Sequence, residues 1–444
     1  MSEQIEQPRT TCAQGGALAT INALPHVIAI SHAAEGCAGN LTNPISFCSG
    51  YNGEGYCGGT QIPTSAIREK HVVFGGADRL REEIKSAQEL LDAELFVVTT
   101  GCMTEMIGDD VQAVVREFED AETPVTAVNT PSFSGDAYAG YEIVLDGIFN
   151  GFVQPAEKKD PKLVNIFGIV PNFDPFFRGD LTEIKRLLER LGLKVNTFFT
   201  PDQTFENVRS SSAASLNIHF SHVWGTGFVK NFEKKFGTPY FTADLPIGAY
   251  ATEKFLRGLA KHIKISKKLL DKVIEEEKES YYRYFAKTVD VITNSQFFYY
   301  SAVVANSNYA LPLAGFLSEE LGWHVEDVII TDILSKNRKA AAEEAFRSTG
   351  LGAELLFEPN AKNIEWHLSK KHFRDRGDRY FDAHSPFYLV GSSIDKYAAD
   401  TLGALTLAVS YPVRSRLIAN RGYAGFRGGL TLLEDLISVP LSGR

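Results

Sequence analysis

Short apolar segments alternate with amphipathic helical patterns along most of this 444-residue chain. The segment ELFVVTTG (94–101) precedes IGDDVQAVVREFED, and KLVNIFGIV (162–170) precedes DLTEIKRLLERLG. The same order returns at EDVIITDI (326–333) and PFYLVGSS (386–393). Apolar strands that alternate with helices favour parallel sheets covered by helices on both faces. We therefore predict a doubly wound α/β fold, whose ligands bind beyond the carboxyl ends of the strands.

The length of the chain suggests about two to four domains. A polar segment with two prolines, GFVQPAEKKDP (151–161), is one predicted seam. A long charged helix over 265–287 is expected to bridge the units that follow. We predict three α/β domains, which span residues 1–160, 161–290 and 291–444.

The composition excludes several classes of protein. A formal net charge of −10 argues against a nucleic-acid-binding protein, since phosphate contacts need a basic face. The sequence contains no apolar run of about 18 residues, so we expect no transmembrane helix and no membrane partner. The N-terminus lacks a charged segment followed by an apolar one, which argues against a secretory signal. Five cysteines make a disulfide framework improbable in so long a chain, so the cytoplasm is the expected compartment.

Cys12, Cys37 and Cys102 each lie beside glycines or other small residues, in TCAQGG, AAEGCAGN and TTGCMTEMIGDD. Cys102 also follows the predicted strand LFVVTT at its carboxyl end, where such sheets bind ligands. Cysteine thiolates hold iron–sulfur clusters, and neighbouring glycines let backbone and sulfide approach closely. The alternative is that these residues are small buried apolar side chains. Their spacings of 25 and 65 residues match no short zinc or ferredoxin signature, so the residues alone leave both interpretations open.

Other polar positions have structural interpretations that compete with functional ones. Cys48 and Cys57 lie nine residues apart in the glycine-rich SFCSGYNGEGYCGG, and we interpret them as structural or incidental. Asp109 and Asp110 of IGDD could bind a cation, although acidic residues are common at a helix N-terminus. The run KKHFRDRGDR (370–379) mixes basic and acidic residues, as an exposed or intersubunit surface does.

Taken in order, several motifs resemble the nitrogenase component 1 family over nearly the whole chain. They are CAQGGAL at Cys12, SHAAEGC at Cys37, VVFGG (72–76), TTGCMTEMIGDDV at Cys102 and NTPSFSG (129–135). LVGSSIDKYAADT (389–401) and NRGYAGFRGGLTLLEDL near the C-terminus are similar to the end of the family's β-type subunits. The resemblance implies three doubly wound Rossmann-like domains, the last with a C-terminal segment at a subunit interface.

The resemblance also implies a cofactor and its ligands. In β-type subunits, three cysteines bind half of the P-cluster, an 8Fe-7S iron–sulfur cluster shared with the α-type subunit. By motif match, Cys12, Cys37 and Cys102 would be those metal ligands. Ser132 matches a serine that ligates the oxidised cluster in some members, although Pro131 and Gly135 alone explain a turn there. Phe74 matches the phenylalanine on the surface where the iron protein docks. Such a chain relays electrons, so we predict no catalytic acid or base in it.

The implied partners are an α-type subunit that carries the active-site cofactor and a homodimeric, ATP-hydrolysing iron protein. Two αβ units would pair into an α2β2 core, and the chain made alone would be unstable or metal-poor. The α-type cofactor is held by a cysteine and a histidine, yet residues 215–241 contain no cysteine here. We therefore interpret His219, His222 and Trp224 as core or interface residues.

Departures from the family pattern bear on the substrate. Only 11 residues precede Cys12, SHAAEGC replaces an HGSQGC-like run, and the insertion YNGEGYCGGTQ (51–61) is unusually rich in glycine. These features favour a nitrogenase-like reductase such as methylthio-alkane reductase, which cleaves carbon–sulfur bonds to release methanethiol and a hydrocarbon. Chlorophyll-type reductases do not show this set of three cysteines in their β-like chains.

Three alternatives stay open at this point. The first is the β subunit of a vanadium- or iron-type nitrogenase that reduces dinitrogen. The second is a scaffold for cofactor assembly, although scaffold subunits usually lack most of these cysteines. The third is a plain sugar- or nucleotide-binding α/β protein with incidental cysteines. A GxGxxG or P-loop pattern is missing where a strand meets a helix, so ATP hydrolysis is assigned to the partner.

Overall fold

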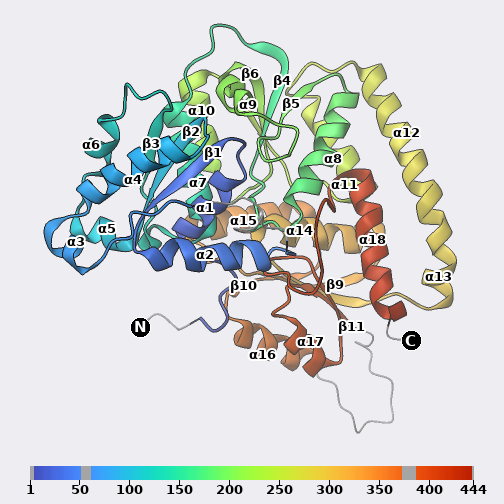
Figure 1. Ribbon diagram of the computed structural model, residues 1–444. Helices are drawn as coiled ribbons and strands as arrows, with labels where there is room; N and C mark the ends of the chain where they lie inside the picture. The colour runs from blue at the N-terminus through green and yellow to red at the C-terminus, as the bar shows by residue number, and fades with distance from the viewer. Residues whose placement is uncertain (1–4, 52–61, 373–386, 443–444) are drawn as a thin grey trace.

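The computed structural model describes residues 5–51, 62–372 and 387–442, and it confirms an α/β fold with parallel sheets (Figure 1). The first sheet has the order β1-β2-β3, formed by Val27–His32, Leu95–Thr100 and Val125–Val128. The second has the order β5-β4-β6-β7, formed by Lys194–Asn196, Asp160–Phe167, Ala214–His219 and Tyr240–Thr242. The third has the order β10-β9-β8-β11-β12, formed by Glu354–Phe357, His324–Ile330, Tyr300–Ala305, Phe387–Gly391 and Leu405–Ala408.

Every strand pairing in these sheets is parallel, as the alternation of strands and helices predicts. Strand order reverses direction in the second and third sheets, which is the doubly wound arrangement, whereas the described first sheet runs in one direction. The sheets fall in three successive parts of the chain, and the exact domain boundaries stay a prediction.

Helices cover both faces of each sheet. Those of the first part are α1 (Ala13–Asn22), α2 (Glu35–Phe47), α3 (Glu69–Phe74), α4 (Ala77–Leu90), α5 (Cys102–Ile107), α6 (Val111–Arg116), η2 (Ser132–Ser134), α7 (Ala137–Leu145) and η3 (Asp146–Phe152). Those of the second part are α8 (Phe177–Arg190), α9 (Phe205–Arg209), η4 (Ser210–Ala213), α10 (Thr226–Phe236), α11 (Gly248–Leu259), α12 (Lys267–Phe285), η5 (Ala286–Thr288) and α13 (Val289–Asn294). Those of the third part are α14 (Ser307–Gly315), η6 (Phe316–Glu320), α15 (Lys336–Thr349), α16 (Ala361–Lys371), α17 (Lys396–Leu402) and α18 (Gly425–Ser442). No helix in the described residues is long and apolar enough to cross a membrane.

The unbroken apolar strands are explained by burial on both faces. In β2, Leu95 and Val97 pack into the main core, while Phe96 and Val98 pack into a second core under α4 and α6. The same division holds for the central strand β8 of the third sheet. A strand with no solvent face shows no polar alternation, and this is why such segments read as continuous apolar runs.

Close backbone packing fixes the N-terminal helix α1. A Cβ atom placed on Gly16 would lie 1.9 Å from the carbonyl oxygen of Ala137, and one on Gly140 would lie 2.0 Å from that of Ala13. The α1 and α7 backbones therefore touch at these two glycines, and no other residue fits there. Because Cys12 immediately precedes α1, this contact also fixes its position.

A buried carboxylate, Asp174, joins the three parts of the chain. Its two oxygens accept hydrogen bonds from Tyr138 Oη (2.9 Å), Asn306 Nδ2 (3.2 Å), Asn308 Nδ2 (2.8 Å) and the backbone N–H of Val170 (2.8 Å). Each oxygen thus has two donors, and the donors come from all three parts. The Asp174 centre, meaning this carboxylate and its four donors, is a completed structural network.

The C-terminal helix α18 lies against α8, α11 and α12 and also against β12 of its own sheet (Figure 1). Close to its start, Asp180 of α8 accepts hydrogen bonds from the backbone N–H groups of Tyr423 (2.6 Å) and Ala424 (2.8 Å). The end of the chain therefore closes over the second part.

Candidate functional site

The three cysteines of the motif set each lie at the start of a helix. Cys12 is the N-cap of α1, Cys37 lies in the first turn of α2, and Cys102 is the first residue of α5. Helices α2 and α5 follow β1 and β2, which pair in parallel, so their first turns meet at one edge of the sheet. All three thiols are free and half-buried.

Electrostatics reflect the same proximity. Burial raises the pKa of Cys37, and the negative charges of the Cys12 and Cys102 thiolates raise it further. Charges more than about 10 Å from a group are largely screened at ordinary salt concentrations. An effect of Cys12 and Cys102 on Cys37 therefore indicates that the three sulfurs lie near one another. The raised pKa keeps Cys37 as a neutral thiol near pH 7, and a bound cation would favour its thiolate instead.

Ser132 lies beside this group of cysteines. The Cys102 thiol donates to Ser132 Oγ at 2.9 Å, and the backbone N–H of Ser132 donates to Cys102 Sγ at 3.1 Å. The predicted turn is present: Pro131 has φ −66° and Gly135 has φ +138°, a value that favours glycine. The turn therefore places both a hydroxyl and an N–H donor against the sulfur.

Cys12 lies close to the N-terminus, yet it is firmly held. It forms a β-bridge with Asp136, and the N–H of Ala13 donates to the carbonyl of Gly135 at 3.0 Å. Upstream, the Arg9 guanidinium forms a buried bidentate pair with Asp395, with both N–O distances 2.6 Å. The residues before α1 are thus anchored to the first and third parts at once.

Phe74, the predicted docking residue, is 86% exposed at the end of α3. Val73 beside it, Met106 on the neighbouring α5 and Phe133 next to Ser132 are also exposed large apolar residues. Helices α3 and α5 pack together, so this apolar edge lies close to the Cys102 helix. Solvent-exposed apolar residues in such a group are typical of an interaction surface.

A buried contact joins the helix of Cys102 to the loop after Phe74, and the sequence motifs do not predict it. His32 has no exposed surface, and its Nε2 lies 3.1 Å from Asp109 Oδ2 while Nδ1 lies 2.8 Å from Ser65 Oγ. Asp109 in turn accepts the N–H of Gly76 at 2.9 Å. Burial lowers the pKa of His32, against the opposing effect of Asp109, so the imidazole is neutral near pH 7. This His32–Asp109 link ties the end of α5 to the loop that follows Phe74.

Of the residues interpreted as core or interface positions, His219 and Trp224 lie in the core, whereas His222 is partly exposed. His219 is fully buried, and burial lowers its pKa to about 3. His222 lies 3.3 Å from Asp244, which raises its pKa. Trp224 stacks on Tyr138 and lies under Arg338. The cavity beside His222 has a volume of about 10 Å³, which is about the space that a single water molecule needs. The described residues leave no room for a cofactor there.

The remaining polar positions have structural roles where the structure describes them. The buried Cys48 thiol accepts from Arg414 Nε at 3.1 Å. Asp110 caps α6 by accepting from Ala113 N at 2.9 Å, so the helix-start interpretation holds for it. Cys57 and residues 373–379 of the charged run lie outside the described residues.

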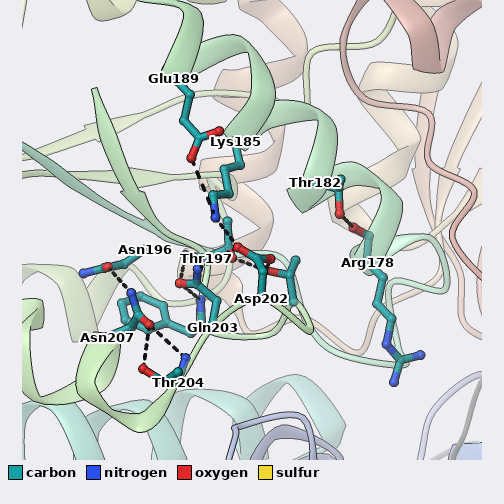
Figure 2. A network of polar contacts seen from close by, with 12 residues as sticks. Arg178, Thr182, Lys185, Glu189, Asn196, Thr197, Asp202, Gln203, Thr204 and Asn207 are labelled. Atoms are coloured by element: carbon teal, nitrogen blue, oxygen red, sulfur yellow. Dashed lines mark hydrogen bonds and ion pairs between the residues drawn. The ribbon is translucent and has the colours of Figure 1, made fainter. Parts of the chain in front are cut away.

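A separate cleft of about 490 Å³ lies between the first and second parts, away from the cysteines. Its border includes the loop after β5, which a network of side chains holds in place (Figure 2). Gln203 Oε1 accepts from the N–H of Thr197 at 2.9 Å, and Asp202 pairs with Lys185. Figure 2 shows Arg178 extending away from this network. The polar groups of the loop satisfy one another, which indicates a structural role.

Comparison with known proteins places this arrangement in a family. The model of the nitrogenase component 1 type oxidoreductases matches residues 12–439. The chain is 23% identical to the nitrogenase molybdenum-iron protein beta chain of Bradyrhizobium diazoefficiens, covering 97% of this chain and 83% of the relative. It is 25% identical to the beta chain of Clostridium pasteurianum, covering 98% and 93%. An alpha chain, from Methanothermobacter marburgensis, is also 25% identical but over 85% of this chain and 74% of the relative.

A solved structure of nitrogenase Cp1 at pH 6.5 has the same fold, with a TM-score of 0.79 at 20% identity. The superposition covers 100% of this chain and 94% of that chain. Since the family model spans almost the full sequence, the protein belongs to the nitrogenase component 1 type oxidoreductases.

Proposed function

We propose that this chain is the β-type subunit of a two-component, ATP-driven nitrogenase-like reductase. The observation that carries the proposal is the convergence of Cys12, Cys37 and Cys102 at the starts of three helices. The beta chains of Bradyrhizobium diazoefficiens and Clostridium pasteurianum match over 97% and 98% of this chain, and the alpha chain of Methanothermobacter marburgensis matches over 85%, which supports the β-type assignment.

The residues fit half of a P-cluster-like 8Fe-7S cluster. Three half-buried free thiols leave one side open, where the thiolates of an α-type subunit would complete the ligand set. The N–H of Ser132 donates to Cys102 Sγ, the kind of contact that tunes the potential of a cluster. When bound, the cluster would supply reversible one-electron storage.

The side chains around the thiols would position the ligands and limit access. Ser132 Oγ lies 2.9 Å from Cys102 Sγ, so both atoms can reach one iron, and the hydroxyl is available as an additional ligand. The anchored residues before α1 hold Cys12 without help from the rest of the N-terminus. The small cavity near His222 is consistent with a substrate-reducing cofactor in the α-type subunit rather than in this chain.

The partners follow from the same assignment. An ATP-hydrolysing, homodimeric iron protein would dock on the apolar edge at Phe74 and deliver electrons to the cluster. Two αβ pairs would form an α2β2 complex in the cytoplasm. For the overall reaction, we favour reductive cleavage of the carbon–sulfur bond of methylthio-alkanes, on the sequence departures around Cys37. Reduction of dinitrogen is the alternative, and it is the activity that the names of the relatives suggest.

The test is iron and acid-labile sulfide per chain after anaerobic purification with the α-type subunit. We expect several irons per chain in the wild type and a large loss in Cys102→Ala. The matched control is Cys48→Ala, which removes a buried thiol outside the group and should keep the iron. Iron near zero in the wild-type complex would contradict the proposal. A scaffold would instead bind iron and release it to an acceptor protein.

The substrate is tested separately, with the complete complex, its iron protein and ATP. Ethylene or methane released from a methylthio-alkane, with ammonia absent under dinitrogen, would support the carbon–sulfur reaction. Ammonia formation would identify a nitrogenase, and the relay assignment of this chain would stand in both cases.

A further inference from the structure

A second group of metal-ligating side chains lies in the third part, between β9 and α16. Asp327 of β9 is completely buried, and Glu326 beside it is nearly so. Opposite them, α16 supplies His367, and His372 is its C-cap. The β9–α16 cluster, as we name Glu326, Asp327, His367 and His372, belongs to none of the motifs that define the cysteine site.

A β-bulge explains how two consecutive strand residues reach the same helix. Ser301 of β8 pairs with Val325, but its neighbour Ala302 pairs with Asp327, so Glu326 is the extra residue. In a regular strand, adjacent side chains point to opposite faces. A bulge re-aims a side chain, and bulges are common beside functional sites. Here it brings a second carboxylate to the imidazole that Asp327 already contacts.

Two carboxylates converge on one nitrogen. Nε2 of His372 lies 3.1 Å from Glu326 Oε2 and 3.3 Å from Asp327 Oδ2. A single Nε2–H shared between both oxygens forms a weaker, bifurcated hydrogen bond, whereas a cation can bind all three atoms directly. Ligands at about 2.0–2.2 Å from a tetrahedral metal are about 3.3 Å apart, which is the separation observed.

The group is also rigid and negatively charged. The His372 ring stacks on Phe387 with the ring centres 4.1 Å apart. The second oxygen of Asp327 is held by His367 Nε2 at 3.2 Å and Lys371 Nζ at 2.8 Å. The carboxylates of Glu326, Asp327 and the nearby Glu354 outnumber the one lysine, Lys371, so the group can accept the charge of a divalent ion.

We propose that His372 Nε2, Glu326 and Asp327 bind a divalent transition-metal ion of the zinc class. One imidazole with two carboxylates suits such an ion better than magnesium or calcium, which prefer oxygen ligands alone. His367 and Lys371 orient the Asp327 carboxylate from its far side, as outer contacts do at metal centres. The ion would fasten the C-terminal end of α16 to the third sheet. The proposal is independent of the cysteine site.

The test measures zinc and iron in the same samples of the full chain purified with its partner subunit. After dialysis against Zn²⁺ and removal of free metal, we expect about one zinc per chain in the wild type. Zinc affinity should fall roughly ten-fold or more in His372→Gln and in Glu326→Gln. The control His262→Gln changes a histidine that stacks on Phe241, far from the cluster, and should keep the zinc.

X-ray absorption at the zinc edge gives a second readout that iron does not obscure. The expected signal is an imidazole nitrogen together with oxygen donors. Glu326→Gln keeps the size of the side chain, so a folding defect of the histidine variant does not decide the result. Wild-type protein that takes up no zinc, or variants that bind it as tightly as the wild type, would overturn the proposal. Iron content should be equal in all variants, which separates this outcome from that of the cysteine site.

Discussion

The Asp174 centre and the cysteine site are both polar groups at the borders of the first part, but they differ in completeness. Asp174 is fully buried, and each of its oxygens has two donors from this chain. Cys12, Cys37 and Cys102 are free and half-buried, and burial together with the other two cysteines raises the pKa of Cys37. A buried group that the chain satisfies by itself stabilises the fold, whereas a group left incomplete requires something from outside. The Asp174 centre is therefore interpreted as a structural group and the cysteine site as a functional one.

Removing the completed centre should have the largest effect on stability. Asp174→Ala removes the charged acceptor that Tyr138, Asn306 and Asn308 share in a buried site. These donors then have only their second acceptors, the carbonyls of Phe173 and Gly168. We expect the free energy of unfolding to fall by about 3 kcal/mol or more. Urea unfolding, followed by tryptophan fluorescence, measures it. Asp202→Ala, which removes an exposed aspartate of the network in Figure 2, is the control and should cost less than about 1 kcal/mol.

Removing the exposed docking residue should leave the stability almost unchanged and reduce the turnover. Phe74→Ala is expected to change stability by less than about 0.5 kcal/mol, because the ring packs against little of this chain. Turnover that depends on the iron protein should fall by roughly ten-fold or more if the ring is an interface anchor. Leu90→Ala, at another exposed apolar residue, should leave turnover intact. Equal turnover in both variants would remove Phe74 from the docking surface.

The His32–Asp109 link is a completed network, like the Asp174 centre, but it supports the helix that begins at Cys102 of the incomplete site. Asp109→Asn turns an acceptor into a donor toward His32 and should weaken docking a few-fold, at a cost of about 1–2 kcal/mol in stability. The KM for the iron protein is the readout. Asp110→Asn is the neighbouring control, because asparagine caps a helix as well as aspartate does. A raised KM in both variants would point to a general disturbance of the loop.

A dependence of stability on pH is also expected. Burial raises the pKa of Asp174 to about 7, above the ordinary value of 3.8. The folded protein therefore binds a proton more tightly than the unfolded chain does. Stability from this group is complete below about pH 4 and is lost as the pH rises through 7. Unfolding measured from pH 5 to 8 should show this fall, and Asp174→Asn should flatten it. A wild-type curve that rises over this range would contradict the assignment.

Much of this organisation could be predicted from the sequence. Segments such as LFVV are buried on both faces, so the strands are visible as continuous apolar runs. The meeting of Cys37 and Cys102 follows from the parallel pairing of β1 and β2, which the alternation of strands and helices already implies. The exposed position of Phe74 agrees with its motif.

Other features depend on contacts that no local pattern records. His32 and Asp109 are 77 residues apart, and nothing in SHAAEGC or IGDD predicts that they meet. Arg9 and Asp395 are separated by almost the whole chain. The bulge at Glu326 depends on the register between β8 and β9, so the apolar pattern of the strand does not reveal the β9–α16 cluster. Pairings set by tertiary packing lie beyond the reach of sequence spacing.

The most direct test of the central claim is an iron anomalous-scattering map from crystals of the anaerobic complex of this chain with its α-type subunit. The account predicts a strong peak within bonding distance of the sulfurs of Cys12, Cys37 and Cys102, with Ser132 Oγ beside it. A complex in which these sulfurs show no anomalous density, while iron is present elsewhere, would contradict it.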